Sequence, residues 1–233
     1  MAEKDRRGAG DAFAHRWNMG EVPANDNGAV RMARGHRLSL LSRASGGECA
    51  AMPESVTLVL FAHPAVERAR LGPMMAEAAA GMPDVEVRDL YELYPDFTVD
   101  VAAEQRALKR AGRIVMQFPF YWYSTPALLK EWMDLVLTHN FAYGAKGYAL
   151  EGKILACALS TGGADHAYGE GGHNRYSVHD FLRPIEQTAR LCRMTWERPF
   201  TVHGAAVLSE DERAATVERY RRWLTRLGPE DPS

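Results

Sequence analysis

Short apolar segments rich in β-branched residues alternate with longer amphipathic segments, and this alternation constrains the fold more than any other feature of the chain. SVTLVLFA (55–62), RIVMQFPF (113–120) and KILACALS (153–160) are apolar at nearly every position. A strand that is apolar on both sides is typical of a parallel sheet buried on both faces. Strands of this kind that alternate with helices predict a sheet covered by helices on both sides.

The order of the expected elements predicts the fold class. We expect strands at 55–62, 85–90, 113–120, 153–160 and 196–204, and helices at 66–80, 100–112, 125–139, 177–194 and 209–228. This order indicates an α/β fold, a flavodoxin-like three-layer sandwich with a five-stranded parallel sheet in the order 2-1-3-4-5.

Polar and turn-forming residues mark the ends of these helices. Asp100 and Thr125 are expected N-caps, and Pro126 then takes the first helical position. Two capping boxes are expected, Ser177 with Asp180 and Ser209 with Glu212. Glycines are expected to end helices at 81, 112 and 228, and Pro184 to kink the helix at 177–194 or mark a later start.

The chain changes character near residue 54. Residues 1–54 are rich in Gly, Arg and acids and have almost no apolar periodicity, so we expect a disordered or loosely attached extension before a domain at 55–228. A transit peptide is a weaker alternative, because such peptides avoid acidic residues.

Composition excludes several functional classes. The net charge of −2 argues against a nucleic-acid-binding protein. No apolar run is long enough for a transmembrane helix, and the N-terminus has no apolar core typical of a secretory signal. The three cysteines lack metal-binding or redox spacing, which fits a cytoplasmic protein; Cys157 and Cys192 are expected to be small buried side chains.

In open parallel sheets, ligands bind outside the carboxyl ends of the strands, which directs attention to the loops after residues 62, 118 and 159. The first loop leads into a helix N-terminus, where backbone N–H groups favour anions. His63 ends the strand there and can donate to a phosphate, with Arg68 and Arg70 adding positive charge. The alternative is that His63 only caps the loop and that the arginines are solvated.

The second loop is aromatic and the third is rich in glycine. Phe120, Tyr121, Trp122 and Tyr123 could wall a flat heteroaromatic ligand, or could form a hydrophobic cluster or a dimer surface. STGG (160–163) allows a ligand to approach the backbone, although such a sequence is often an ordinary loop. The long glycine-rich segment at 162–175 is typical of a functional loop or lid.

Several longer motifs carry a resemblance. They are FAHP (61–64), DLYELYPDFTVDVAAEQ (89–105), FPFYWYSTPALLKEWMDLVLTHNFAYG (118–144), STGG (160–163) and NRYSVHDFLRPIEQTARLCRMTW (174–196). With these motifs the chain from about 55 to 228 resembles the flavodoxin-fold NAD(P)H:quinone oxidoreductases. It is most similar to the ancillary oxidoreductase subunits of glutathione-gated potassium efflux systems.

The resemblance implies bound FMN, with FAD as the alternative, and two-electron ping-pong reduction of a quinone by NADH or NADPH. It implies a homodimer, with a potassium-efflux antiporter as a further partner that would hold the protein at the inner face of the membrane. It assigns Tyr168 and His173 to catalysis. The residues it assigns to cofactor binding are His63, Ala69, Arg70, Leu71, Gly72, Pro119, Phe120, Tyr121, Trp122, Ser160, Thr161, Gly162 and Gly163. No metal site is expected.

One departure from the family pattern concerns the phosphate. The pattern after His-Pro usually carries a serine and an asparagine, and this chain has Ala69 and Gly72 there. A hydrogen bond to a charged group is typically worth about 1.5–3 kcal/mol. We therefore expect weaker FMN binding unless backbone N–H groups, Arg68 and Arg70 compensate. The departure favours one alternative, a flavin-binding regulatory subunit with little turnover. A further alternative is a pocket whose aromatics serve mainly dimerisation.

Overall fold

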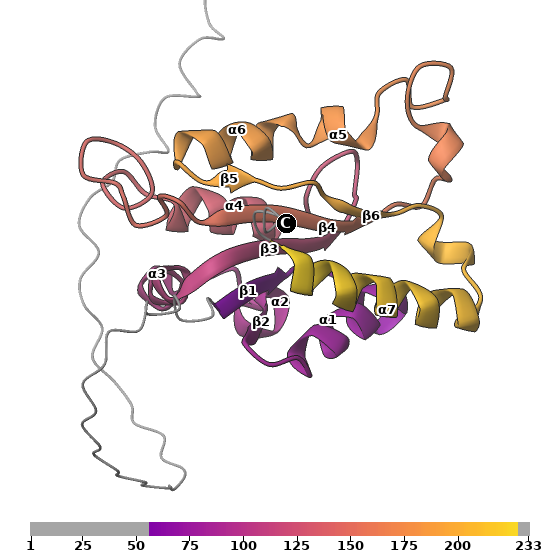
Figure 1. The fold of residues 1–233 in the computed structure, drawn as a ribbon, viewed down its shortest axis with the longest axis horizontal. Coiled ribbons are helices and arrows are strands. Elements are labelled where there is room, and N and C mark those ends of the chain that lie inside the picture. Colours follow the sequence, from indigo (N-terminus) through magenta and orange to yellow (C-terminus); the bar gives the residue numbers. More distant parts are fainter. Residues whose placement is uncertain (1–55, 228–233) are drawn as a thin grey trace, which may run out of the picture. The chain divides into compact units, whose positions relative to one another are not determined.

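The computed structural model describes residues 56–227, which form a parallel sheet between two layers of helices (Figure 1). The sheet is six-stranded, with the order β2-β1-β3-β4-β5 and with β6 paired to β4. The strands are β1 (Val56–Phe61), β2 (Val85–Asp89), β3 (Ala111–Pro119), β4 (Ile154–Ser160), β5 (Thr195–Trp196) and β6 (Phe200–Val202). The expected flavodoxin-like order 2-1-3-4-5 is confirmed.

Alternating side chains of the strands divide the core between the two faces of the sheet. The α-helices are α1 (Leu71–Ala80), α2 (Leu90–Leu93), α3 (Val101–Arg110), α4 (Ala127–Val136), α5 (Val178–Phe181), α6 (Arg183–Leu191) and α7 (Glu210–Arg226). Leu58 and Leu60 of β1 pack with residues of α3 and α4. Val59, between them, packs on the other face with residues of α1 and α7. The continuous apolar run in β1 is therefore explained by burial on both sides.

The strand expected at 196–204 is divided into two short segments. β5 pairs with the beginning of β4 and β6 pairs with its end. Pro199, between them, has no backbone N–H to give to the ladder, whereas the N–H of Glu197 still donates to Leu155 O at 2.9 Å. The fifth strand is thus present but interrupted, which accounts for the sixth strand in the sheet.

Two expected helix boundaries were wrong because of local backbone constraints. The helix expected at 66–80 begins at Leu71, after a 3-10 turn at Val66–Arg68. Pro73 lies in the first turn of α1, and an earlier start would set its ring against the carbonyl group four residues before it. The helix expected at 100–112 ends at Arg110, because the chain enters β3 at Ala111 before the expected glycine stop.

The helix expected at 125–139 is also shorter than its sequence pattern, since α4 begins at Ala127 and ends at Val136. Pro126 is its N-cap, with an extended backbone (ψ 153°), so Thr125 is not the cap. Asp100 caps α3 as expected, accepting from the N–H of Ala103.

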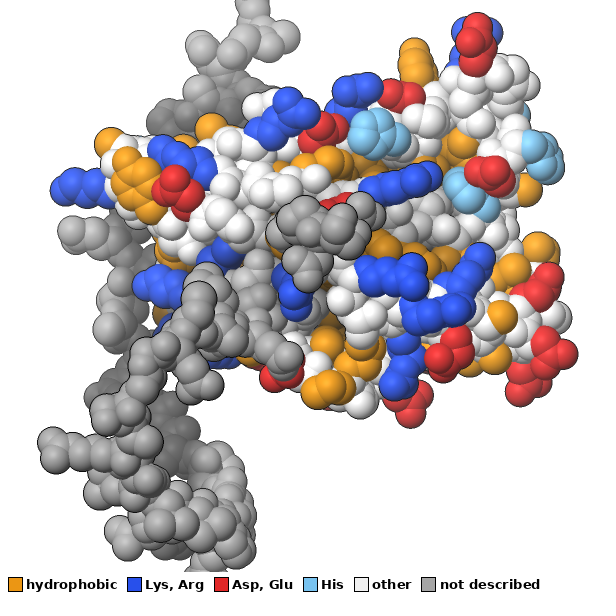
Figure 2. Space-filling model, viewed as in Figure 1, with side chains coloured by type: hydrophobic (Ala, Val, Ile, Leu, Met, Phe, Trp, Pro, Cys, Tyr) orange, Lys and Arg blue, Asp and Glu red, His pale blue; other side chains and the backbone are white. Residues whose placement is uncertain are grey.

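The segment at 177–194 is split into α5 and α6 at Leu182, before Pro184. Both expected capping boxes are formed, at the beginnings of α5 and α7. Acidic residues fill the first turn of α7 and Arg226 lies in its last turn, which complements the helix dipole. Figure 2 shows acidic side chains gathered near the start of α7 and basic side chains along it.

A buried carboxylate ties α3 to three other elements. Glu104 is fully buried and accepts from Trp132 Nε1 at 2.9 Å, Tyr94 Oη at 2.5 Å and Arg88 Nε at 2.9 Å. Burial raises the pKa of Tyr94 to about 12, and its bond to Glu104 adds to the shift. A buried charge requires such a full set of donors, and the network fixes the packing of β2, α2, α3 and α4.

The extension expected at 1–54, with Cys49, lies outside the described residues. Cys157 and Cys192 are buried free thiols, as expected, and burial raises the pKa of both. Across residues 56–227, no helix combines the length and apolar character needed to cross a bilayer. Within the same residues, no cluster of His, Cys, Asp and Glu side chains is suited to a metal ion.

Candidate functional site

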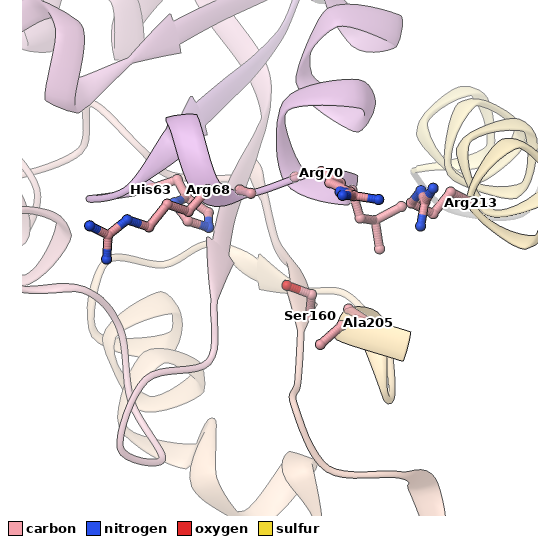
Figure 3. Close-up of a pocket in the computed structure, with 10 residues that line it drawn as sticks. His63, Arg68, Arg70, Ser160, Ala205 and Arg213 are labelled. Carbon is pink, nitrogen blue, oxygen red and sulfur yellow. The ribbon is translucent and has the colours of Figure 1, made fainter. Parts of the chain in front are cut away.

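The carboxyl ends of β1 and β4 face a basic cavity of about 440 Å³ (Figure 3). Its basic side chains come from distant parts of the chain: Arg70 is the N-cap of α1, and Arg213 lies in α7. In Figure 3 these two side chains extend towards each other, whereas Arg68 extends away from them beside His63. The lining residues are His63, Arg68, Ala69, Arg70, Leu71, Gly72, Ser160, Ala205, Ala206 and Arg213.

Neither of the two facing arginines has an acidic partner among residues 56–227. The Arg213 guanidinium donates to the carbonyl oxygen of Leu208, which fixes its direction, and Arg70 has no ion pair among the described residues. Like charges brought to one cavity without a carboxylate create a positive potential that favours an anion. The backbone N–H groups at the start of α1 add to this field.

His63 is arranged to donate a hydrogen bond in its neutral form. Burial lowers the pKa of its ring, and the carboxylates of Glu67 and Asp89 offset part of that effect. Its Nδ1 accepts from the N–H of Ala65 at 3.2 Å, which leaves the proton of the neutral ring on Nε2. The Tyr121 ring meets the His63 ring edge-on, with centroids 6.1 Å apart.

A buried hydrogen-bond chain holds the start of α1 against the sheet. The Tyr220 hydroxyl of α7 donates to Gln117 Oε1 at 2.9 Å, and Gln117 Nε2 donates to the carbonyl of Gly72 at 2.8 Å. Tyr220 and Gln117 are nearly inaccessible to solvent, and burial raises the pKa of Tyr220. The chain fixes the position of the loop on which Ala69 and Arg70 lie.

A second, aromatic cavity of about 280 Å³ lies beyond the end of β3. Its floor and walls come from the expected aromatic loop and from the glycine-rich segment after β4. The lining residues are Phe120, Trp122, Tyr123, Gly163, Ala167, Tyr168, His173 and Asn174. Tyr123 donates to Asn174 Oδ1 at 3.1 Å and stacks on Phe181, so it joins the two segments.

The aromatic loop turns through a tight and strained hairpin. Tyr121 and Ser124 exchange both backbone hydrogen bonds, at 3.1 and 3.0 Å. The residues between them, Trp122 and Tyr123, both have positive φ angles, of 49° and 63°, as a type I′ turn requires. A residue other than glycine in this backbone conformation costs about 1–3 kcal/mol of folding free energy, and such residues are concentrated at functional sites. The turn leaves the Trp122 side chain 93% exposed.

The loop after β4 lies between the two cavities. Ser160 faces the basic cavity and Gly163 the aromatic one, and a narrow crevice beside them reaches Pro119 and Phe118. A Cβ at Gly162 would meet no atom within 4 Å, so this position faces open space. Thr161 was expected to bind the cofactor, but its side chain is buried and its hydroxyl donates to Gly163 O within the protein.

The structure brings most of the expected site residues to one edge of the sheet, and it adds others. The additional lining residues are Ala167, Asn174, Ala205, Ala206 and Arg213. The capping box at Ser209 already placed a helix start after the last strand, at the carboxyl edge, and this was the available signal for Arg213. The alanines carried no signal, since their contribution is only to leave space.

The sequence and structure of known proteins agree with this architecture. Residues 55–227 match the model of a family described as having a flavodoxin-like fold. The chain belongs to this flavodoxin-like family.

This chain aligns with nearly the whole length of its relatives in the flavodoxin-like family. The chain is 44% identical to the glutathione-regulated potassium-efflux system ancillary protein KefF of Salmonella typhi over 167 residues, which are 72% of this chain and 94% of that protein. A general stress protein 14 from Treponema denticola, solved in complex with FMN, has a TM-score of 0.70 and 38% identity, covering 74% of this chain and 99% of that one. An NADPH-quinone reductase from P. pentosaceus has a TM-score of 0.68 and 34% identity, with the same coverage.

Proposed function

We propose that this protein is an FMN-dependent NAD(P)H:quinone oxidoreductase. The observation that carries the proposal is the pair of cavities at the carboxyl edge of the sheet, one basic and one aromatic, on either side of the loop at 160–163. A phosphorylated flavin has the same two parts, a phosphate and a flat ring. The relatives solved with FMN or named as quinone reductases support the same assignment.

The basic cavity would hold the phosphate. Neutral His63 would donate from Nε2, and Arg70 and Arg213 would supply charge in place of the serine and asparagine that the family pattern has at positions 69 and 72. Charge-assisted bonds are about twice as strong as neutral ones. The absence of side-chain donors at Ala69 and Gly72 is therefore compatible with tight phosphate binding.

The aromatic cavity would hold the reacting partners. A bound flavin would supply the redox chemistry, which is hydride transfer from NADH or NADPH and two-electron reduction of a quinone. Phe120 and Trp122 would stack the rings, and backbone N–H groups of Gly162 and Gly163 would face the polar edge of the flavin. Tyr168 and His173, which line the cavity, would donate hydrogen bonds or a proton to the quinone oxygen.

The visible spectrum of the purified protein tests this proposal. We expect two flavin bands in the near-ultraviolet and blue, bleached by NADH or NADPH without oxygen and restored by a soluble quinone. FMN and FAD are distinguished by chromatography of the released cofactor. A protein that stays colourless after incubation with excess FMN and FAD would contradict the proposal, and comparison of NADH with NADPH sets the preferred donor.

A second function, a flavin-binding regulatory subunit of a potassium-efflux antiporter with little turnover, is favoured by the 44% identity to the KefF ancillary proteins. The protein would then act in the cytoplasm, at the inner face of the membrane, as a homodimer bound to its partner. Co-purification with an antiporter, together with negligible quinone reduction by a flavin-loaded sample, would select this function. Rapid turnover without any antiporter binding would select the enzyme.

A further inference from the structure

The loop at 161–163 is bonded to a segment near the end of the chain. Thr161 N donates to Val202 O at 2.9 Å, Gly204 N to Gly163 O at 2.9 Å, and Ala205 N to Thr161 O at 3.0 Å. Gly204 has a positive φ of 63°, which lets the chain leave β6 sharply at this point. These bonds place residue 203 directly beside the loop that we assign to the flavin edge.

The His203 ring lies between two partners on that loop. Its Nδ1 is 3.2 Å from Thr161 Oγ1, and its Nε2 is 3.1 Å from Asp165 Oδ1. The Tyr168 ring is 5.3 Å away, centroid to centroid, and lies against Gly163, where an added Cβ would meet Tyr168 Cε2 at 3.3 Å. One imidazole therefore contacts both ends of the segment at 161–168.

Counting protons shows which form of His203 satisfies both partners. The Thr161 hydroxyl donates its single proton to Gly163 O at 2.8 Å, so its oxygen can only accept from His203 Nδ1–H. The Asp165 carboxylate can only accept, so it requires a second proton, on Nε2. A neutral ring that donates to Thr161 turns an Nε2 lone pair towards the carboxylate. The imidazolium makes both bonds.

The charges around His203 are few. Among residues 56–227, Asp165 is the one charged side chain bonded to the ring, and Tyr168 is the titratable group in ring contact with it. Thr161 is neutral and buried. The His203 ring thus contacts one carboxylate and the tyrosine that lines the aromatic cavity.

We propose that His203 is a positioning residue of the site, which in its doubly protonated form holds Thr161 and Asp165 together and sets the loop at 161–163 and Tyr168 in place. The part that concerns flavin binding rests on the proposed function. His203 lines neither cavity and acts through the loop, which distinguishes it from Tyr168 and His173.

Hydrogen exchange of the flavin-free protein tests, without any ligand, whether His203 holds Thr161 and Asp165 together. We expect His203→Gln, which keeps the size of the side chain and loses its charge, to speed amide exchange in a peptide spanning 161–168. Asp165→Asn should do the same to a smaller degree, and it removes only a surface carboxylate, so it keeps the test valid if the first variant folds poorly. His166→Gln, which changes an exposed histidine on the same segment, is the matched control. Equal exchange in wild type and both variants overturns the proposal.

Riboflavin binding as a function of pH tests the protonated form. Riboflavin has no phosphate, so ionisation of a phosphate does not contribute. We expect wild type to bind about two- to tenfold more tightly at about pH 5.5 than at about pH 8, the range typical of one hydrogen bond. His63 and His173 also face the cavities, and their effect on riboflavin affinity is the same in wild type and variant. The difference between the two proteins therefore isolates His203.

In His203→Gln this pH difference should shrink, and in His166→Gln it should persist. An identical pH profile in wild type and His203→Gln overturns the role of protonation. If wild type binds no flavin at any pH, the proposed function fails, while the exchange measurement still decides whether His203 positions the loop.

Discussion

At the scale of single residues, the site depends on a few side chains whose surroundings determine what they can do. His63 is a neutral donor because burial lowers its pKa and because the N–H of Ala65 occupies Nδ1. Arg70 and Arg213 line one cavity, and none of the residues lining that cavity is Asp or Glu. In the proposed phosphate site, this charge takes the place of the serine and asparagine of the family pattern.

The replacement predicts a phosphate-dependent loss of affinity. We expect Arg213→Gln or Arg70→Gln to weaken FMN binding about ten- to a hundredfold, the value of one hydrogen bond to a charged group. Riboflavin, which lacks the phosphate, should bind wild type and variants alike, as measured by quenching of flavin fluorescence.

Arg222→Gln is the matched control, since Arg222 is an exposed residue of the same helix and does not line the cavity. An equal loss for FMN and riboflavin would show that the arginines shape the protein and do not bind the phosphate. Added salt should reduce the difference between wild type and variants, because ions screen exposed charges.

At the scale of elements, the site is held by bonds between the helices and the sheet. α1 and α7 are adjacent on one face, and both are tied to β3 through Gln117. The start of α1 carries the first loop, so the packing of α7 also determines where that loop lies.

Removal of one link in this chain should lower stability. We expect Tyr220→Phe to reduce the free energy of unfolding by about 1–3 kcal/mol, because Gln117 Oε1 is left buried without a donor. Urea unfolding followed by circular dichroism measures the change. Tyr176→Phe, at a tyrosine that is 62% exposed, is the control and should be neutral. Equal stability of wild type and Tyr220→Phe would mean that water replaces the hydroxyl.

At the scale of the whole molecule, the aromatic turn has the features of a surface completed by a second subunit. Trp122 is 93% exposed at the tip of a turn whose backbone is strained, beside Tyr121 and Tyr123, which are each more than 40% exposed. Large aromatic side chains are enriched at subunit interfaces. These exposed aromatic side chains support the expected homodimer.

We expect Trp122→Gly to weaken a homodimer at least about tenfold, since a buried tryptophan is a typical hot spot of an interface. Glycine adopts positive φ readily, so the monomer should keep or gain stability. Sedimentation equilibrium measures the dimer and thermal unfolding the monomer. Tyr148→Gly, at another exposed aromatic residue, is the control. A protein that is monomeric before substitution would contradict the expected dimer.

The sequence by itself determined the layered fold and the edge of the sheet on which to look. Apolar strands such as 55–62 can only be buried between two layers of helices, and the carboxyl ends of parallel strands lie together, so the loops at His63, Phe120 and Ser160 had to share one edge. Local chemistry also fixed the capping boxes, because Ser209 and Glu212 bond to backbone groups only three residues apart.

Only the tertiary structure decided which distant side chains complete the site. Arg213 and Arg70 line one cavity, and His203 contacts Thr161 and Asp165, across long separations in sequence, and no local pattern encodes such an arrangement. Pro73 and Pro199 shifted element boundaries for the same reason: the backbone obeys sterics and the hydrogen bonding of its neighbours, whereas periodicity reports only burial. Thr161 shows the limit most clearly, since its hydroxyl is committed to His203 and Gly163 inside the protein.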